Sequence, residues 1–580
     1  MRLPKISTRI SINTSINTSP SSSLTYFLRT HSLSSMAASM DFLSNPILMS
    51  VITALCLVLL FHFFHKKAKP HGKKYHPIGA TVFHLFINFN MMHHYMTDLA
   101  EKYKSYRILS LIQGEVYTAD PANVEYILKT NFKNYGKGKH THSIASDLLG
   151  DGIFTVDGDQ WREQRKVSSQ EFSTKILRDF SSVIFRNNTI KLGKILSQAA
   201  DSNQIIDIND LFMKATTDSI FKVGFGIDLD NLSGRNEEGA RFSRAFDDAN
   251  NLTYKRFVDV SWKIKRFFNI GFEAELKKNM KIVDEFVYKV IQVKIELMQK
   301  SKDEFLVVGC DEMGTDGLKK EDILSRFIQV NDRDPKYLRD IILNFMLAGK
   351  DPIAISMCWF IYMLCKHPEV QDKVAKEIIE ATNLNKEITD VADFAARVSD
   401  TALDKMEYLH AALTETIRLY PALPVDPKVC FSDDVLPDGC NVNKGDVVAY
   451  LPYAMGRLKY IWGDDALEFK PERWLDQYGC FHQESPFKFT AFQAGPRTCL
   501  GRDFAYRQLK IFSSVLLGWF VFKLSNENKV PQYRTSINLH VDGPLQVYVF
   551  HRSGIQNPST YNCETRSVWV NPNQKKFDSV

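Results

Sequence analysis

The segment from Phe492 to Gly501 constrains the fold of this chain more than any other, because residues with distinct physical uses follow one another in it. Gly495 and Gly501 allow a tight turn, Arg497 can pair with an anion through two parallel hydrogen bonds, and Cys499 offers a thiolate. A buried structural cysteine in a Gly-Pro turn would explain Cys499 alone, but not the phenylalanine, the glycines and the arginine at these offsets. The segment therefore predicts a loop built around a thiolate ligand.

Heme iron is the metal that suits such a loop. A cysteinate on heme iron pushes electron density toward a bound oxygen and favours O–O cleavage, provided that the sulfur is shielded and receives backbone N–H donors. Phe492 can cover the sulfur side of the heme, and Arg497 can bind a heme propionate. The segment thus predicts heme b as the cofactor, with Cys499 as the metal ligand.

The same segment resembles the signature of the cytochrome P450 family at every fixed position. Trp161-Arg-Glu-Gln-Arg165 resembles a helix of that family in which the tryptophan and the arginine both reach heme propionates. The resemblance implies that Trp161 and Arg165 bind the cofactor. Lys428 is a candidate for another propionate contact, and a surface lysine is the alternative.

Two further segments resemble the network that lies beneath the heme in this family. Glu415 and Arg418 stand one helical turn apart and so share a helix face. Phe469-Lys-Pro-Glu-Arg473-Trp474 resembles the segment whose arginine completes a Glu-Arg-Arg network. The resemblance implies that Glu415, Arg418 and Arg473 hold the thiolate loop in place, which is a structural and not a catalytic role.

The chain departs from the family at the oxygen groove. Ala348-Gly349-Lys350-Asp351-Pro352-Ile353 is similar to the motif Ala/Gly, Gly, any residue, acid, Thr, Thr, and the resemblance assigns Ala348, Gly349 and Asp351 to this catalytic site, but both threonines are absent. In the family the hydroxyl of the first threonine organises proton delivery. Pro352 lacks the N–H that would bond the Ala348 carbonyl, so it should keep open the helix break that oxygen needs. Asp351, Ser356 or an ordered water would then carry the protons.

Hydrophobic periodicity predicts a mainly α fold with minor β, and the resemblance implies the cytochrome P450 fold over one heme-thiolate catalytic domain, residues 81–552. Asp334 is a typical helix cap and Pro335 is a typical first residue of a helix. They predict the start of a long apolar helix that ends at Cys365. The other predicted elements are helices over Glu369 to Glu380 and Tyr408 to Leu419, and strands near Val447 to Leu451 and Gln546 to Phe550.

The N-terminal region predicts a membrane anchor. Residues 46–64 carry no formal charge and are long enough to cross a bilayer as a helix. The lysines of the basic linker, residues 65–80, place the catalytic domain on the cytosolic side of the endoplasmic reticulum, as a single-pass protein. A buried core helix and a cleaved signal peptide are the alternatives.

The two ends of the chain are expected to lie outside the folded domain. Residues 1–45 have the composition of a disordered or transit-like leader. Organelle targeting through residues 1–40 therefore stays open, as does a start at Met36 or Met40. Residues 553–580 are expected to be a disordered tail.

The composition of the chain limits the kinds of ligand and partner that it is expected to bind. Lys plus Arg number 73 against 67 Asp plus Glu, a net charge of +6, which is far from the balance of a nucleic-acid binder. The nine cysteines are an odd number and form no C-x-x-C pair, so neither a zinc module nor a disulfide scaffold is expected. His93-His94 and His140-Thr-His142 lack further ligands at metal spacing and are expected at the surface or in loops.

Electrons must come from another protein, because no complete G-x-G-x-x-G is present. NADPH would act only indirectly, through a flavoprotein reductase. Five basic residues are expected to dock an acidic flavoprotein: Arg162, Lys166, Arg502, Arg507 and Lys510. The alternative is that they form a solvated basic patch.

These features together predict a heme-thiolate monooxygenase that inserts one oxygen atom of O2 into a lipophilic substrate. The resemblance spans roughly residues 150–550, and Leu436-Pro-Asp-Gly, Tyr453-Ala-Met-Gly-Arg457 and Glu484-Ser-Pro-Phe-Lys-Phe-Thr-Ala-Phe492 look like the plant branch that hydroxylates fatty acids at the terminal carbon. The substrate implied is a long-chain fatty acid, and membrane lipid is a second partner. The alternatives are a reductase-independent fatty-acid hydroperoxide isomerase or dehydratase, and a non-catalytic heme-binding protein.

Overall fold

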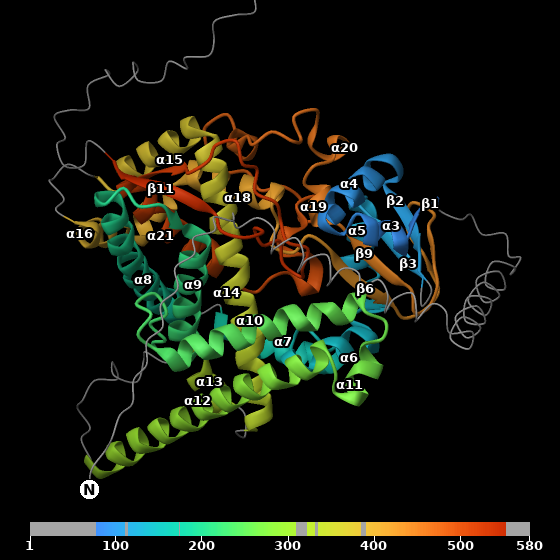
Figure 1. Cartoon of the computed structure of the whole chain (residues 1–580), viewed down its shortest axis with the longest axis horizontal. Helices are drawn as coiled ribbons and strands as arrows, with labels where there is room; N and C mark the ends of the chain where they lie inside the picture. Colours follow the sequence, from blue (N-terminus) through green and yellow to red (C-terminus); the bar gives the residue numbers. More distant parts are fainter. Residues whose placement is uncertain are drawn as a thin grey trace, which may run out of the picture. The chain divides into compact units, whose positions relative to one another are not determined.

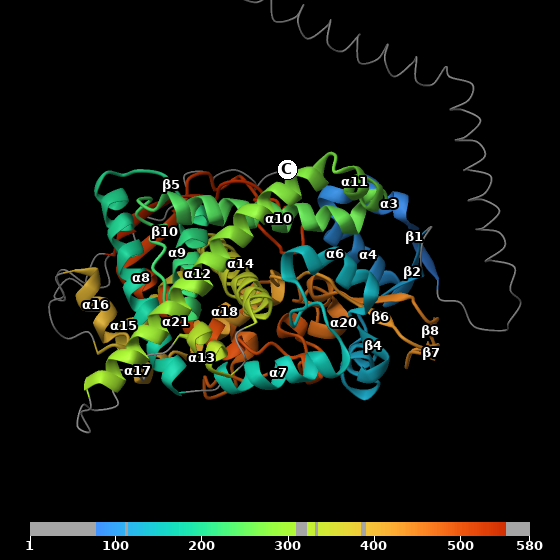
Figure 2. The ribbon, with the colours of Figure 1, turned by 90° about the horizontal axis from the view of Figure 1, so that it is seen from below.

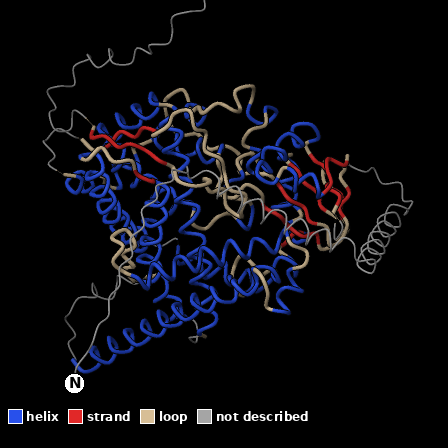
Figure 3. The backbone as a smooth tube through the Cα atoms, viewed as in Figure 1, coloured by secondary structure: helices blue, strands red, loops and turns tan. Residues whose placement is uncertain are grey.

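Helices make up most of the structure, with three small sheets at its margins (Figures 1 and 3). The computed structural model describes residues 77–110, 114–172, 175–308, 322–330, 334–383 and 390–552. All of them belong to one compact unit, Lys74–Val580. The expected mainly α fold with minor β is confirmed, while the anchor, the leader, most of the linker and the tail lie outside the described residues.

In the described part of the chain, the α-helices α9 to α18 follow one another between β5 and β6, and the other strands lie before or after this helical stretch. The helices are α3 (Val82–Ile87), α4 (Met92–Tyr103), α5 (Pro121–Glu125), α6 (Gly138–Leu149), α7 (Gly158–Phe172), α8 (Lys175–Asp201), α9 (Ile208–Phe225), α10 (Glu237–Val258), α11 (Trp262–Phe268), α12 (Phe272–Val308), α13 (Ile323–Val330), α14 (Pro335–Lys366), α15 (Pro368–Ala381), α16 (Val391–Arg397), α17 (Asp400–Asp404), α18 (Glu407–Leu419), α19 (Pro452–Met455), α20 (Lys459–Trp462) and α21 (Arg502–Trp519). The strands are β1 (Ile78–Thr81), β2 (Ser105–Leu109), β3 (Glu115–Thr118), β4 (Tyr135–Gly136), β5 (Ile206–Asp207), β6 (Asp426–Cys430), β7 (Asp434–Val435), β8 (Asn441–Val442), β9 (Val447–Tyr450), β10 (Phe520–Leu524) and β11 (Gln546–His551).

The long helix α14 runs through the middle of the helical part (Figure 2). It begins where the sequence predicts, because the Asp334 side chain accepts a hydrogen bond from the Lys336 N–H at 3.0 Å and Pro335 occupies the first turn. Within the described residues it is the one helix with the length and apolarity to span a membrane, and 78% of its apolar window is buried, as expected of a core helix.

The helix break expected at Pro352 is not seen, since α14 is continuous through this residue. Its neighbours α9 and α12 pack along it and constrain its path. The chemistry of proline still removes the N–H that would bond the Ala348 carbonyl. The Ser356 hydroxyl donates to the Pro352 carbonyl at 2.8 Å, so this side chain is engaged with the helix backbone.

The largest sheet has the strand order β1-β2-β3-β9-β6-β4 and is separate from the helical core. Strand β9 pairs in parallel with β3 and antiparallel with β6. One face of this sheet packs on α4 around Tyr106, Val116 and Tyr450. Strand β6 carries Lys428, so the sheet delivers this residue to the interior.

His93 and His94 lie on α4, and only His93 contradicts the expectation of surface or loop histidines, because His94 is exposed. His93 is buried against Tyr453 and Tyr533, and burial lowers its pKa to about 3. The Tyr533 hydroxyl also contacts the His94 Nδ1 at 3.1 Å. His140 and His142 are half-exposed to exposed, as expected, but they lie in α6 and not in a loop.

Trp359 tests the packing of α14. Its indole stacks on Tyr420 with ring centroids 4.1 Å apart and donates to the Leu539 carbonyl at 2.9 Å. Trp359→Ala should lower the free energy of unfolding by about 3–5 kcal/mol, because it leaves a cavity. Urea denaturation measures this change, with exposed Tyr478→Ala as the matched control. Equal midpoints for the two variants would contradict the assigned packing.

Candidate heme-thiolate site

The thiolate loop folds as two short turns, η5 (Thr490–Phe492) and η6 (Gly495–Arg497), followed by α21. The Cys499 N–H donates to the Phe492 carbonyl at 2.8 Å and closes the loop. Gly495 has a φ of +63°, and a Cβ there would collide with the carbonyl oxygen of Leu128. Only glycine fits at this position, because the loop backbone presses on the segment that contains Leu128.

Part of the Cys499 side chain is accessible to solvent, although many protein atoms lie around its sulfur. Burial raises the pKa of its thiol, and the opposing influences are a hydrogen bond from the Gly501 backbone N–H and the positive charges of Arg165 and Arg502. An accessible sulfur with an enclosed environment lines an interior space. This arrangement provides the backbone N–H donor and the shielding that a metal-bound thiolate needs.

Arg497 reaches from the loop to the segment before α7. Its Nη2 donates to the Asp157 carboxylate at 2.7 Å and to the Val156 carbonyl at 3.0 Å, and its guanidinium lies 4.4 Å from the ring centroid of Trp161. Its buried Nε has no hydrogen-bond partner in the described structure. A buried donor without an acceptor is costly, so this atom fits an anionic group such as a propionate.

Trp161 and Arg165 come from successive turns of α7 and meet the same loop. Trp161 is buried between Phe132 and Arg497. An Nη of Arg165 donates to the Thr498 carbonyl, next to Cys499. The structure therefore brings Trp161, Arg165, Arg497 and Cys499 together at the thiolate loop.

Glu415, Arg418 and Arg473 also meet, as the resemblance implies. The Arg418 Nε and Nη2 each donate to a Glu415 carboxylate oxygen at 2.7 Å, and both side chains have no exposed surface. The Arg473 Nε lies 3.4 Å from the same carboxylate. Trp474 donates a further bond at 2.9 Å, which sequence reasoning did not assign although Trp474 follows Arg473 directly.

Lys428 is buried, so the alternative of a surface lysine is wrong. Its Nζ bonds the Asp426 carboxylate at 2.8 Å. Burial lowers the pKa of Lys428 to about 7, and the charges of Lys137 and Arg497 act in the same direction while Asp426 opposes them. Lys428 therefore belongs to a buried charged group near Arg497, with Asp426 as its partner.

The three α14 residues expected at the oxygen site lie on different faces of the helix. Ala348 is exposed although most of α14 is buried, so its face opens on an interior space. Gly349 packs so closely on Ile220 of α9 that a Cβ would force the latter to shift. Asp351 is buried and points into a polar cluster, where its nearest cation is the Lys350 Nζ at 3.4 Å.

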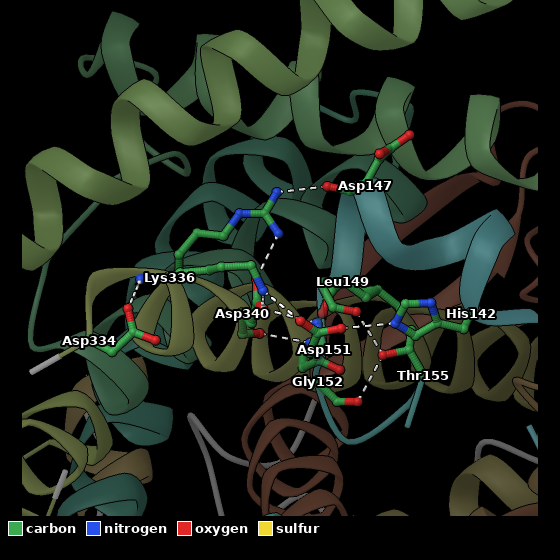
Figure 4. A network of polar contacts seen from close by, with 12 residues as sticks. His142, Asp147, Leu149, Asp151, Gly152, Thr155, Asp334, Lys336 and Asp340 are labelled. Carbon is green, nitrogen blue, oxygen red and sulfur yellow. Dashed lines mark hydrogen bonds and ion pairs between the residues drawn. The ribbon is translucent and has the colours of Figure 1, made fainter. Parts of the chain in front are cut away.

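The segment between α6 and α7 is fastened to the start of α14 (Figure 4). The Asp151 N–H donates to the Asp340 carboxylate at 2.9 Å, and the Asp151 carboxylate bonds Lys336 at 2.6 Å and His142 at 2.9 Å. The hydrogen bond from Lys336 is the main reason that the pKa of Asp151 lies below its usual range. The clasp holds the start of the segment that leads to Asp157, and the Asp157 carboxylate itself accepts hydrogen bonds from the Lys137 and Gly138 N–H groups at 2.9 and 2.8 Å.

A cavity of about 340 Å³ lies beside the loop and is bordered by Phe492, Thr498 and Tyr506. Of the basic residues expected to dock a flavoprotein, Arg502, Arg507 and Lys510 line this cavity and are only partly exposed, whereas Arg162 and Lys166 are exposed. Arg507 pairs with Asp400 at 2.8 Å and Lys510 donates to the Leu403 carbonyl at 2.7 Å.

Taken together, the helical fold and this loop define a heme-thiolate protein. The family model for cytochrome P450 matches residues 70–547. Cytochrome P450 704C1 of Pinus taeda is 51% identical over 483 residues, which cover 81% of this chain and 90% of the relative. Cytochrome P450 704B1 of Arabidopsis thaliana is 43% identical over 526 residues, 86% of this chain and 98% of the relative, and cytochrome P450 94A1 of Vicia sativa is 37% identical over 454 residues, 76% and 83%. The chain belongs to the cytochrome P450 family, and it is an oxidoreductase of the monooxygenase type.

Glu415→Gln tests the buried network. The substitution keeps the shape but leaves the two arginines without their carboxylate, so it should lower the free energy of unfolding by about 3–5 kcal/mol and reduce the heme content of the purified protein. Urea denaturation and heme absorbance measure the two effects. Exposed Glu468→Gln is the control, and heme content that is equal in both variants would argue against a role in holding the loop.

Proposed function

We propose that this protein is an endoplasmic reticulum monooxygenase that hydroxylates a long-chain fatty acid at its terminal carbon. Electrons would come from NADPH through a separate flavoprotein reductase. The observation that carries the chemistry is the enclosed but accessible sulfur of Cys499, with the Gly501 N–H as its donor. When bound there, heme b supplies the activation of O2 that an amino-acid side chain cannot.

The residues around the sulfur would bind and orient the heme. The unpaired Nε of Arg497 and the side chain of Arg165 would receive propionates, since both are cations beside the interior space. Lys428 would join them if a propionate draws its ammonium from Asp426. Glu415 and its arginine partners would hold the loop from the other side and touch no substrate.

The proposed substrate rests on the resemblance to the plant branch and on the apolar face of α14. Ala348 and the half-buried Pro352 stand one helical turn apart and present no polar side-chain atom to the interior space. Such a wall suits a hydrocarbon chain. The polar residues of this turn, Lys350 and Asp351, lie on other faces.

Lipid contact is supported by the surface around α11. Val260, Ile264, Phe267 and Phe268 are exposed, Phe267 at 82%, and Lys265 and Arg266 lie among them. Apolar and cationic side chains in one short stretch suit the surface of an anionic membrane. We propose that this surface meets the membrane that residues 46–64 would span, with the domain on the cytosolic side.

A second function deserves a test because Pro352 has no hydroxyl. A cytochrome P450 that rearranges fatty-acid hydroperoxides needs neither a reductase nor protons delivered to bound O2. The absence of the threonine at this position favours that alternative.

Product formation distinguishes the two functions. Membranes that hold the full chain and a plant reductase should form the terminal hydroxy acid from a long-chain fatty acid only when NADPH is added. Pro352→Thr should raise the amount of product per NADPH, because a hydroxyl would then order the proton donor. Loss of a fatty-acid hydroperoxide without reductase, together with no NADPH-dependent product, would establish the second function instead.

A further inference from the structure

The cavity beside the thiolate loop has a wall rich in aromatic side chains. Its volume is about 340 Å³, which is enough for a small organic ligand. The wall comes from α17, α18, α21 and the segment from Trp474 to Thr498. The cavity is therefore built from other elements than α14, which carries the residues of the expected oxygen site.

Six aromatic side chains of this wall contact one another in a closed cycle. The ring centroids of successive members lie between 4.2 and 6.1 Å apart. Aromatic rings pack favourably on one another in offset and edge-to-face arrangements, so this wall suits the ring of an aromatic ligand. In order around the cycle, the six side chains are His410, Phe481, Trp474, Phe489, Phe492 and Tyr506.

The charges of the wall favour a neutral ligand. The His410 imidazole carries no charge at neutral pH, because burial lowers its pKa to about 3. The cations and anions of the wall are equal in number, so neither sign of ligand charge is preferred. They are Arg502, Arg507 and Lys510 against Asp404, Glu484 and Asp503.

The Oε1 of Gln493 is a buried acceptor at this cavity, and it has no hydrogen-bond partner among the described residues. Other polar groups of the wall are already paired. The hydroxyls of Tyr506 and Thr414 bond each other at 2.9 Å, and the Thr498 hydroxyl donates to the Gly495 carbonyl at 2.7 Å. A buried acceptor without a donor is costly, so an N–H or O–H group of a ligand would satisfy this atom.

We propose that this cavity binds a small, neutral, mono- or bicyclic aromatic molecule that carries an N–H or O–H group, as indoles and phenols do. The ring packs among the six aromatic side chains, and its N–H or O–H donates to the Gln493 Oε1. Phe492 and Thr498 belong to the loop that carries Cys499, so the bound molecule contacts this loop. The site is distinct from the one that would hold a fatty acid, and it does not depend on the proposed function.

Equilibrium dialysis of labelled indole against the full-length, heme-loaded protein tests the site without turnover. A long-chain fatty acid at saturating concentration is present in every sample, which keeps indole out of the proposed substrate site. Indole should bind saturably. Benzofuran, which has the same shape but no N–H, should compete about three- to tenfold more weakly, the range of one neutral hydrogen bond.

Three variants locate the bound indole. Gln493→Met keeps a side chain of similar length without the acceptor, so indole and benzofuran should bind it equally. Gln483 is exposed and borders the cavity, so Gln483→Trp should fold normally, narrow the mouth and weaken indole binding about tenfold. His482→Trp introduces the same bulk at the exposed neighbouring position outside the wall and should bind indole as the wild type does.

Equal affinity of Gln483→Trp and His482→Trp for indole would overturn the proposal, and so would equal affinity of the wild type for indole and benzofuran. Tighter binding of tetramethylammonium than of indole would contradict the ligand class, because the aromatic side chains would then recognise a cation. If the cavity instead receives a side chain of the reductase, indole would not bind and Gln483→Trp would weaken reductase association, which also overturns the proposal. A wild type that oxidises no fatty acid would contradict the proposed function alone.

Discussion

The buried carboxylate of Glu415 is the interaction on which the site depends. It is bonded by two nitrogens of Arg418, by Arg473 and by Trp474, and so joins α18 to the turn η4 (Pro471–Trp474). Arg418 also donates to the carbonyls of Ala466 and Glu468. Charges that are buried without partners destabilise a protein by several kcal/mol, so these segments must stay together.

The thiolate loop is fixed by contacts of its own. Its backbone is pressed on Leu128 at Gly495, and its Arg497 is fixed by Asp157, which in turn accepts hydrogen bonds from the Lys137 and Gly138 N–H groups. Cys499 is therefore positioned by contacts from α7, from the segment before it and from the loop itself. The structure therefore restricts the sulfur from several directions.

Local features of the sequence predicted much of this. The cap at Asp334, the proline after it and the apolar pattern to Cys365 define α14 almost to the residue, because helix starts are encoded by neighbouring residues. The helical spacing of Glu415 and Arg418 predicted that they share a face, and the resemblance to the family supplied Arg473 as the third member. The strands β9 and β11 were found from alternation alone.

Contacts between distant residues could not be predicted in the same way. Lys350 and Asp247 are 103 positions apart, and His93 and Tyr533 are 440 apart, so nothing local indicates that they meet. Lysine is usually a surface residue, and Lys428 is buried because its strand β6 lies between β9 and β4 in the sheet. Pro352 was expected to interrupt α14, but the packing of the neighbouring helices overrides the local preference.

The reduced carbon monoxide spectrum of the full-length protein tests the central claim, that the Cys499 thiolate binds heme iron. We expect the thiolate-type spectrum for the wild type and its complete loss in Cys499→Ala. The spectrum should be retained in Cys480→Ala, because Cys480 is the other exposed cysteine among the described residues. A thiolate-type spectrum that survives in Cys499→Ala would contradict the assignment of this residue as the axial ligand and, with it, the account of the loop.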